Sequence, residues 1–425
     1  MSASAKAGYG RGAAILSLGI GTTGLITFAY FSLASHALSE DAYGGITLLW
    51  SAVFITVSVL YRPVEQLLSR TIADRDARGF EGNEHLRVAA TIQLALGLLF
   101  AVTALALRGP LEDDLFNGSS TLYWVLIGTV LAYAASYFAR GFLAGHHRFG
   151  LYGGLVLMEA SSRCLFALAV TIGIAEGQSV VALGMVAAPV LSLALVPFGL
   201  SRRLERAEGE SQEAEGEFTL AHGTGFATAV LLIMLAEQTF LNAGPLLVKL
   251  TEGGAAGAAL AGFVFNVLLI ARAPLQLFQA IQASILPHLT RLRASGEADP
   301  FRRSVNVTLV AIAGFAGLVA LVMLAAGPSL MDLVFGGDAD YERGGLVLIS
   351  LGMGLYLSAA TLNQALLARS HVGVTSACWV GAAALFVVFL LAFEFDDRVL
   401  QVETGYVGAA LLLCALLYAL YRRDA

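Results

Sequence analysis

Residues 302–328 read RRSVNVTLVAIAGFAGLVALVMLAAGP, and this stretch decides the class of the fold. Between its paired arginines and its closing Gly-Pro, 23 consecutive residues carry no charge. A helix that rises ~1.5 Å per residue needs ~20 mainly apolar residues to cross ~30 Å of hydrocarbon. The stretch therefore predicts a helix that spans a membrane and starts at a basic border.

The same kind of run occurs twelve times along the 425 residues. The chain is 57% hydrophobic and 13% charged, whereas a soluble domain has roughly 25% charged residues. This composition predicts an all-α polytopic membrane protein with twelve transmembrane helices. The runs lie near residues 13–35, 42–61, 88–107, 119–139, 151–175, 179–200, 221–244, 257–285, 304–326, 345–366, 373–393 and 404–421.

The basic residues are sorted between alternate gaps. Nineteen of the 25 lysines and arginines, from Lys6 and Arg11 to Arg422 and Arg423, lie in the termini and in every second gap. The other gaps hold only Arg108, Lys249, Arg343 and Arg398. By the positive-inside rule, the arginine-rich side is cytoplasmic. We expect a multi-pass protein of the cell (inner or plasma) membrane with both termini in the cytoplasm.

The two halves of the chain repeat one another. Segment 109–118 begins with Gly-Pro, continues with Asp-Leu and ends with Gly, and segment 327–336 repeats this pattern at a shift of 218 residues. Six crossings return a chain to its starting side, so the halves form a parallel repeat about an axis along the membrane normal. The repeat predicts two six-helix lobes, 1–201 and 221–425, around a central cavity. Residues 202–220 form a cytoplasmic linker.

The sequence lacks the residue patterns that several kinds of binding and catalysis require. The net charge of −6 does not favour nucleic-acid binding. With only two lysines the chain has no Gly-x-x-x-x-Gly-Lys phosphate loop, and His146-His147 has no acidic or cysteine neighbours for a metal site. Cys164, Cys378 and Cys414 lie in apolar runs. We therefore expect no enzyme activity, no cofactor and no metal.

Four ionisable residues lie inside predicted spans, where a central charge costs about 2.5–3.5 kcal/mol unless it has a partner or faces water. Glu159 and Arg163 are four residues apart on one helix, which favours either a structural ion pair or a functional role, with Glu159 a second candidate for ion coupling. Glu237 has no basic residue within a helical turn. It is the first candidate for binding a coupling proton or sodium ion.

The fourth is Arg272, which lies two residues before Pro274 and matches Arg62 beside Pro63 in the first repeat. Two repeat-related arginines at bent helices can converge on one anion, because guanidinium donates two hydrogen bonds to a phosphate. Arg11, at the foot of the first span, is a third candidate. We predict that these three residues contact an anionic substrate in the cavity.

Two segments carry a resemblance to a known family. Leu38-Ser-Glu-Asp-Ala-Tyr43-Gly44 resembles the Leu-Gly-x-x-x-Tyr-Gly loop of the polysaccharide flippases, a branch of the multidrug/oligosaccharidyl-lipid/polysaccharide (MOP) exporter superfamily, although Ser39 replaces the usual glycine. Residues 141–150, GFLAGHHRFG, resemble that branch's Gly-x-x-x-Gly-x-x-Arg-[Phe/Tyr] pattern. The resemblance implies a flippase that moves a polyprenyl-linked oligosaccharide, the precursor of a cell-surface polysaccharide, across the membrane by alternating access.

The resemblance also implies partners: the lipid-linked glycan, membrane lipid, and a polysaccharide polymerase with its assembly proteins. Two alternatives remain open. A cation-coupled exporter of small amphipathic drugs or metabolites would depend on Glu237, and a non-transporting scaffold for glycan assembly would not depend on the charges inside the spans.

Overall fold

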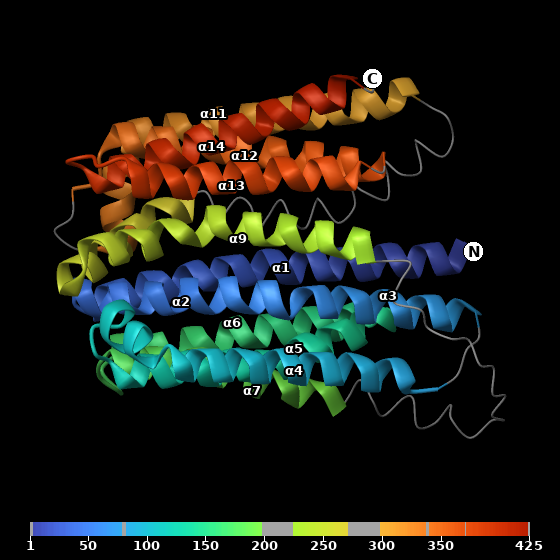
Figure 1. Cartoon of the computed structure of the whole chain (residues 1–425), viewed down its shortest axis with the longest axis horizontal. Coiled ribbons are helices and arrows are strands. Elements are labelled where there is room, and N and C mark those ends of the chain that lie inside the picture. Colours follow the sequence, from blue (N-terminus) through green and yellow to red (C-terminus); the bar gives the residue numbers. More distant parts are fainter. Residues whose placement is uncertain are drawn as a thin grey trace. The chain divides into compact units, whose positions relative to one another are not determined.

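The computed structural model describes residues 3–78, 82–197, 224–270, 298–336, 340–369 and 371–423, and it is helical (Figure 1). In the first half, the elements are α1 (Ala3–Ala37), α2 (Glu40–Leu60), α3 (Arg62–Arg78), α4 (Glu84–Ala106), the π-helix η1 (Pro110–Leu115), α5 (Ser120–Gly145), α6 (Phe149–Thr171), α7 (Gln178–Ser192) and the 3₁₀ turn η2 (Leu193–Leu195). In the second half they are α9 (Thr224–Glu252), a helix over Gly254–Ile270, α11 (Ala298–Phe335), α12 (Arg343–Ala368), α13 (Val372–Ala392) and α14 (Arg398–Arg423).

The all-α fold is confirmed, and the described helices are roughly consistent with the predicted twelve, although residues 271–285 of the eighth predicted span lie outside the described residues. Ten helices of the described residues are long and apolar enough to cross a membrane. The 35-residue α1 and the shorter apolar helix Gly254–Ile270 lie at the first and eighth predicted spans. The protein is therefore an all-α multi-pass membrane protein.

The chain divides into two compact units. Unit 1 comprises Met1–Ala37 and Ala52–Thr224, and unit 2 comprises Leu38–Ser51 and Gly225–Ala425. The lobe boundaries expected from the repeat stay a prediction, and the proposed linker 202–220 lies outside the described residues. The sequence did not indicate that residues 38–51, the start of α2, would belong with the second half.

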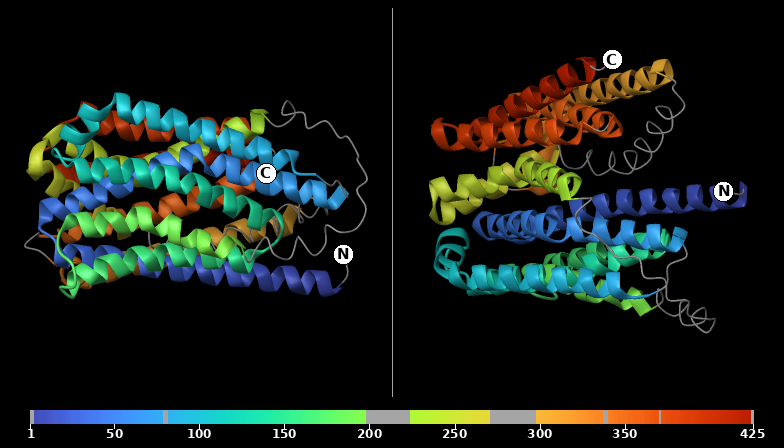
Figure 2. Two further views of the ribbon diagram at one scale, coloured as in Figure 1. Left: turned by 90° about the horizontal axis from the view of Figure 1, so that it is seen from below. Right: turned by 45° about the vertical axis from the view of Figure 1, so that its right-hand side comes forward.

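In unit 1, α5 contacts α3, α4, α6 and α7, while α1 lies along α6 (Figure 2). The contact with α3 is close because α5 presents two glycines four residues apart. A Cβ atom added at Gly141 would lie 2.9 Å from the Glu65 carbonyl oxygen, and one at Gly145 would lie 2.7 Å from Cβ of Ile72. Small residues at this spacing allow two helix backbones to approach within a membrane.

In unit 2, α12 packs against α11, α13 and α14, and aromatic rings fill the core. Phe240 of α9 is fully buried, and its ring centroid lies 5.7 Å from that of Tyr356 and 6.2 Å from that of Trp379. Phe386 stacks on it at 5.8 Å. Edge-to-face and offset pairs of this kind stabilise by about 0.5–1.5 kcal/mol beyond the area they bury.

Both copies of the Gly-Pro motif end in the same backbone conformation. Gly118 has φ 79° and Gly336 has φ 62°, a left-handed region that glycine adopts without a steric penalty. The copies differ upstream, because Gly109-Pro110 opens the π-helix η1 whereas Pro328 lies inside α11. The repeat is thus preserved at the turn that leaves the membrane.

Candidate functional site

Unit 1 buries four charged side chains together in the interior of its helices. Glu159 is 2% exposed, Arg163 is 4% exposed and Glu65 is 9% exposed. Arg140 of α5 is 12% exposed. A charge in such surroundings needs a partner and hydrogen bonds, because the loss of hydration exceeds most single interactions.

Both carboxylate oxygens of Glu159, in α6, have polar partners. Arg140 Nη2 forms an ion pair with its Oε2, and the hydroxyls of Ser136 and Ser192 donate to its Oε1 over 2.5 Å and 3.3 Å. The structure thus adds Arg140 as a partner of Glu159, while the expected ion pair with Arg163 stays a prediction. The arginine that reaches Glu159 comes from the neighbouring helix, because the Glu159 side chain points toward α5 and α7.

Arg163 contacts aromatic side chains. Its Nη1 donates to the hydroxyl oxygen of Tyr133 over 2.7 Å, and its guanidinium carbon lies 5.8 Å from the ring centroid of Phe54. A guanidinium over an aromatic face is stabilised by the ring quadrupole, and more so where water is excluded. Arg163 therefore ties α6 to both α2 and α5.

Glu65 of α3 accepts a 2.8 Å hydrogen bond from the Tyr152 hydroxyl. The charges of Arg140 and Arg62 both act on it. Arg62 is half-buried at the first position of α3, and α2 ends at Leu60, just before Arg62-Pro63. Pro63 has no amide proton to donate back into α2, and it is accommodated in the first turn of α3, where that donor is not needed. The bend expected at this proline stays a prediction.

Arg140 and Glu65 were not predicted as members of this cluster, because both lie at or beyond the ends of apolar runs. A signal was present in the spacing of Tyr133, Ser136, Tyr137 and Arg140. These positions share one face of a helix, and the Arg140 guanidinium carbon lies 4.6 Å from the ring centroid of Tyr137. A polar stripe on an otherwise apolar helix marks the side that meets other helices.

Glu237, the expected coupling acid, is half-buried on α9 in unit 2. Its side chain is not isolated, because it takes part in a polar or electrostatic interaction. Its neighbour Gln238 is 8% exposed, and Asn242 Nδ2 donates to Gln238 Oε1 over 3.0 Å. Arg272 lies outside the described residues. Arg11 is in α1, and its side chain lies outside the described part of the chain.

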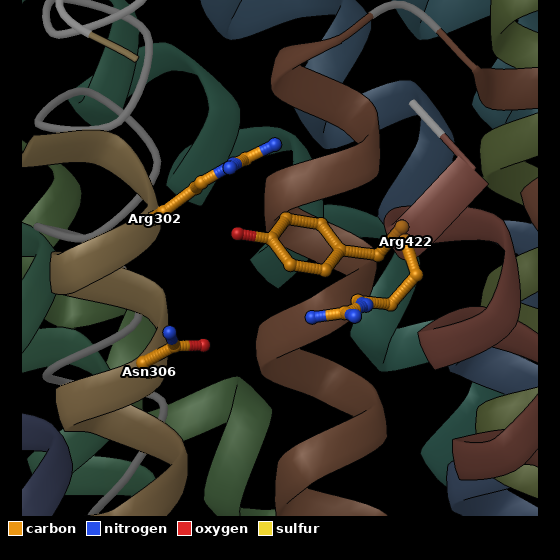
Figure 3. Close-up of a pocket in the computed structure, with 4 residues that line it drawn as sticks. Arg302, Asn306 and Arg422 are labelled. Carbon is orange, nitrogen blue, oxygen red and sulfur yellow. The ribbon is translucent and has the colours of Figure 1, made fainter. Parts of the chain in front are cut away.

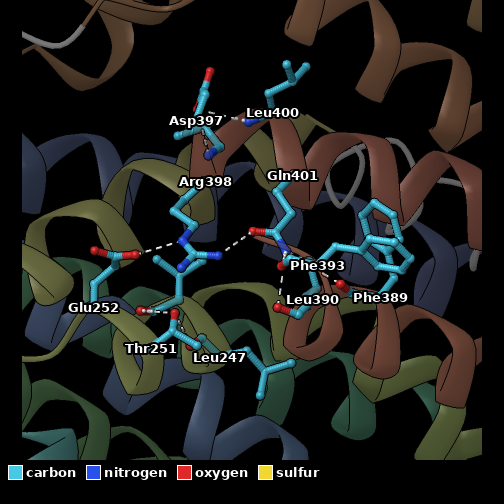
Figure 4. A network of polar contacts seen from close by, with 12 residues as sticks. Leu247, Thr251, Glu252, Phe389, Leu390, Phe393, Asp397, Arg398, Leu400 and Gln401 are labelled. Atoms are coloured by element: carbon cyan, nitrogen blue, oxygen red, sulfur yellow. Dashed lines mark hydrogen bonds and ion pairs between the residues drawn. The ribbon is translucent and has the colours of Figure 1, made fainter. Parts of the chain in front are cut away.

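Two residues that the sequence placed in loops prove to be structural. Lys249 is fully buried, and its Nζ donates to the Gly254 carbonyl oxygen over 2.8 Å, where Gly253 and Gly254 both have left-handed backbones. A cation is favourable at the end of a helix such as α9, where carbonyl groups lack partners. Arg398 bridges Glu252 at 2.7 Å and Gln401 at 2.9 Å, as Figure 4 shows.

The two segments that carry the family resemblance are points of close helix packing. The Tyr43 hydroxyl donates to Asn266 Oδ1 over 2.5 Å, and Asn266 Nδ2 donates to the Tyr341 hydroxyl oxygen over 3.2 Å. A Cβ atom at Gly44 would lie 1.9 Å from the Ala258 carbonyl oxygen. The first segment therefore seats the start of α2 on the helix Gly254–Ile270, and the second seats α5 on α3.

His146, one of the two adjacent histidines, hydrogen-bonds through Nδ1 to the Phe142 carbonyl oxygen at 2.9 Å, at the end of α5. Cys164, Cys378 and Cys414 are half-buried free thiols. Within the described residues, no group of three His, Cys, Asp or Glu side chains is arranged to hold a metal ion.

Comparison with solved structures identifies the architecture. An inward-facing multidrug resistance MATE family transporter of the MOP superfamily aligns over 97% of this chain and 98% of its own, with a TM-score of 0.73 and 13% identity. The Vibrio cholerae MATE transporter VcmN in its bent form aligns over 98% of each chain, with a TM-score of 0.57 and 14% identity.

This protein has the MATE transporter fold. The eukaryotic MATE transporter AtDTX14 agrees, with a TM-score of 0.57 and 14% identity over 98% of this chain and 96% of that one. No family model matches the sequence, and no curated protein matches it. The inward-facing transporter is itself a member of the MOP superfamily, the superfamily whose motifs this sequence resembles. Identities this low establish the fold alone.

Proposed function

We propose that this protein exports an amphipathic substrate by alternating access of its two lobes, and that the substrate is a polyprenyl-linked oligosaccharide for a cell-surface polysaccharide. The observation that carries the export proposal is the MATE fold, which covers 97% of the chain. The two motif segments, at Tyr43-Gly44 and at 141–150, support the flippase branch. In this proposal a polysaccharide polymerase receives the glycan on the far side of the membrane.

The buried cluster of unit 1 supports the role of a lobe that moves as a rigid body. Glu159, Arg140 and Arg163 connect α2, α5, α6 and α7 through hydrogen bonds and ring contacts. Opening such a network would leave a charge unpaired in a low dielectric. We therefore propose that motion occurs between lobes, whereas the helices within unit 1 keep their contacts.

An excess of positive charge in this cluster supports an anionic substrate. Arg62, Arg140 and Arg163 face two carboxylates, Glu65 and Glu159. Arg62 is the half-buried member at a helix start, and we propose that it contacts the diphosphate of the lipid carrier. Arg11 and Arg272 are proposed to act with it, on the basis of their sequence positions.

For coupling to an ion gradient we propose Glu237 in preference to Glu159. Glu159 accepts one ion pair and two hydroxyl hydrogen bonds, so a proton or a sodium ion would have to displace Arg140. Glu237 is half-buried inside the seventh predicted span, where an acid can take up a proton or bind a cation. An ion shifts the equilibrium between two conformations only by its differential affinity for them.

A second candidate function is the cation-coupled export of small amphipathic molecules. It is favoured by the similar solved structures, which include a multidrug resistance MATE transporter. Purified protein in proteoliposomes distinguishes the two candidates. We expect translocation of a fluorescent polyprenyl-diphosphate oligosaccharide, whereas translocation of small amphipathic cations alone would establish the second candidate. Movement of neither compound would reject both and favour a scaffold.

Variants assign the residues in the same assay. Arg272→Ala and Arg62→Ala should abolish glycan translocation, while Arg272→Lys, which lacks the bidentate fork, should retain part of it. Glu237→Gln should remove the dependence on the imposed gradient and leave substrate binding intact. Full gradient dependence in Glu237→Gln would place the coupling site elsewhere.

A further inference from the structure

Unit 2 contains a basic pocket that the proposed function does not use. A cavity of about 280 Å³ is lined by Arg302 and Asn306 of α11 and by Tyr421 and Arg422 of α14. Figure 3 shows Arg302 and Asn306 projecting from one helix toward the side on which Arg422 lies. The volume is near the lower end of the ~300–1,000 Å³ of small-molecule sites, which suits a compact polar group.

The wall of this pocket is held by a third arginine. Arg369, at the end of α12, donates from Nη1 to the Tyr421 carbonyl oxygen over 3.0 Å. Its guanidinium carbon lies 4.5 Å from the ring centroid of Tyr421 and 4.9 Å from that of Phe301. Arg369 is thus sandwiched between α11 and α14, and it fixes the orientation of Tyr421 beside the cavity.

The Tyr421 hydroxyl is a buried donor that a ligand in the pocket could satisfy. Tyr421 is 2% exposed, and among the described residues its hydroxyl has no hydrogen-bond partner. A buried polar atom without a partner is unfavourable, and most such atoms in proteins are satisfied by protein, water or a bound molecule. Because Tyr421 lines the cavity, its hydroxyl can donate a hydrogen bond to an oxygen atom of a molecule held there.

The positive charge of the pocket favours an anionic ligand. Two of the four lining residues that the structure describes are arginines, and none of these four is acidic. Guanidinium, amide and phenol groups can all donate to oxygen, and guanidinium forms paired hydrogen bonds with a phosphate. The pocket is therefore suited to a phosphate group and unsuited to a cation.

Its position in the chain places it at the membrane border. Arg302 and Arg303 directly precede the apolar run 304–326, and Arg422 and Arg423 directly follow the run 404–421. Basic pockets at the cytoplasmic ends of transmembrane helices lie at the depth of lipid headgroups, where anionic lipids are concentrated. The sequence predicts this end to be cytoplasmic.

We propose that this pocket binds the phosphate group of an anionic molecule, with charge from Arg302 and Arg422 and hydrogen bonds from Asn306 and Tyr421. The described lining residues all belong to unit 2, and the site goes beyond the proposed export function. A phospholipid headgroup or free phosphate can supply the group. A bound phosphate would bridge the first turns of α11 and the last turn of α14, and thereby tighten this end of the unit.

Binding is tested with the full-length protein in detergent, without transport, so its failure is separate from failure of the export proposal. Native mass spectrometry and thermal shift measure the retention of phosphatidylglycerol against phosphatidylcholine, and a parallel titration uses inorganic phosphate. We expect saturable binding of one probe. Arg302→Gln/Arg422→Gln should weaken it about tenfold or more, and Tyr421→Phe about threefold.

The matched control is Arg343→Gln, which removes the same charge from an exposed position at the start of α12 and should leave binding unchanged. Preference for phosphatidylglycerol that phosphate does not displace identifies a lipid site. Saturable phosphate binding that the double variant loses identifies a free-anion site. The proposal is overturned if neither probe saturates, or if the double variant and Arg343→Gln bind equally.

Discussion

The Tyr43 hydroxyl donates a 2.5 Å hydrogen bond to Oδ1 of Asn266, a residue 223 positions later in the chain. Next to it, Gly44 lies against the backbone of Ala258, and a Cβ added at Gly262 would lie 3.1 Å from Cα of Gly44. These contacts explain why residues 38–51 belong to unit 2 although they are encoded among the helices of unit 1.

The Gly44 contact predicts a severe effect for a single methyl group. Gly44→Ala would place Cβ 1.9 Å from the Ala258 carbonyl oxygen, so the helices must separate. Overpacking of this kind destabilises by about 1–3 kcal/mol. Gly408→Ala in α14 is the control, because nothing lies within 4 Å of the added Cβ, and it should stabilise by up to about 1 kcal/mol. Thermal unfolding in detergent measures both. Equal melting temperatures for the two variants would contradict this packing.

We predict a strong coupling energy between Arg140 and Glu159 in a double-mutant cycle. Because both side chains are buried, Arg140→Met or Glu159→Leu alone leaves one charge without its partner and should destabilise by about 3–5 kcal/mol. The double variant should recover most of this loss, since two apolar side chains need no partner. Stability in a denaturant series gives the coupling energy, and purely additive losses would show that the pair does not act as a unit. Arg108→Ala, at an exposed ion pair, should change the global stability far less than either buried variant.

Outside the spans, we predict that the stability of the turn around Glu112 depends on pH. A hydrogen bond from Arg108, followed by one from Ser120, lowers the pKa of the Glu112 carboxyl below its ordinary 4.5. The carboxylate therefore stabilises the turn at pH values above 4.5, and this contribution is lost as the pH falls through the lowered pKa.

The Gly118 amide, which donates to the Glu112 carbonyl oxygen over 2.7 Å, reports on this turn. Its protection from hydrogen exchange should fall below pH 4.5, after correction for the intrinsic exchange rate. In Glu112→Gln the pH dependence should disappear. Unchanged pH dependence in that variant would assign the effect to another group.

The distribution of arginines predicts that both termini and the linker 202–220 are cytoplasmic. With Cys164, Cys378 and Cys414 replaced, a cysteine at Gln212 should react with an impermeant thiol reagent only after cells are opened. A cysteine at Asp396, in a predicted external loop, should react in intact cells. Labelling of position 212 in intact cells would reverse the topology.

The sequence alone determined the all-α class and the approximate number of membrane-spanning helices. The thickness of the bilayer fixes the minimum length of a spanning apolar run. A run such as 304–326 therefore predicts a transmembrane helix whatever helices pack around it. The repeat of segments 109–118 and 327–336 could likewise be read from the chain, because both copies need a glycine where the backbone is left-handed.

Only the tertiary structure decided which charges meet. The sequence paired Glu159 with Arg163 because four residues bring two side chains to one helix face. In the structure, Arg140 of α5 pairs with Glu159, Tyr133 accepts from Arg163, and Lys249 and Arg398 are built into helix ends. Helical periodicity fixes the face from which a side chain projects, but the partner depends on which helix packs there. Packing is set by close contacts such as Gly141 with Glu65 and Gly44 with Ala258, between residues far apart in the chain.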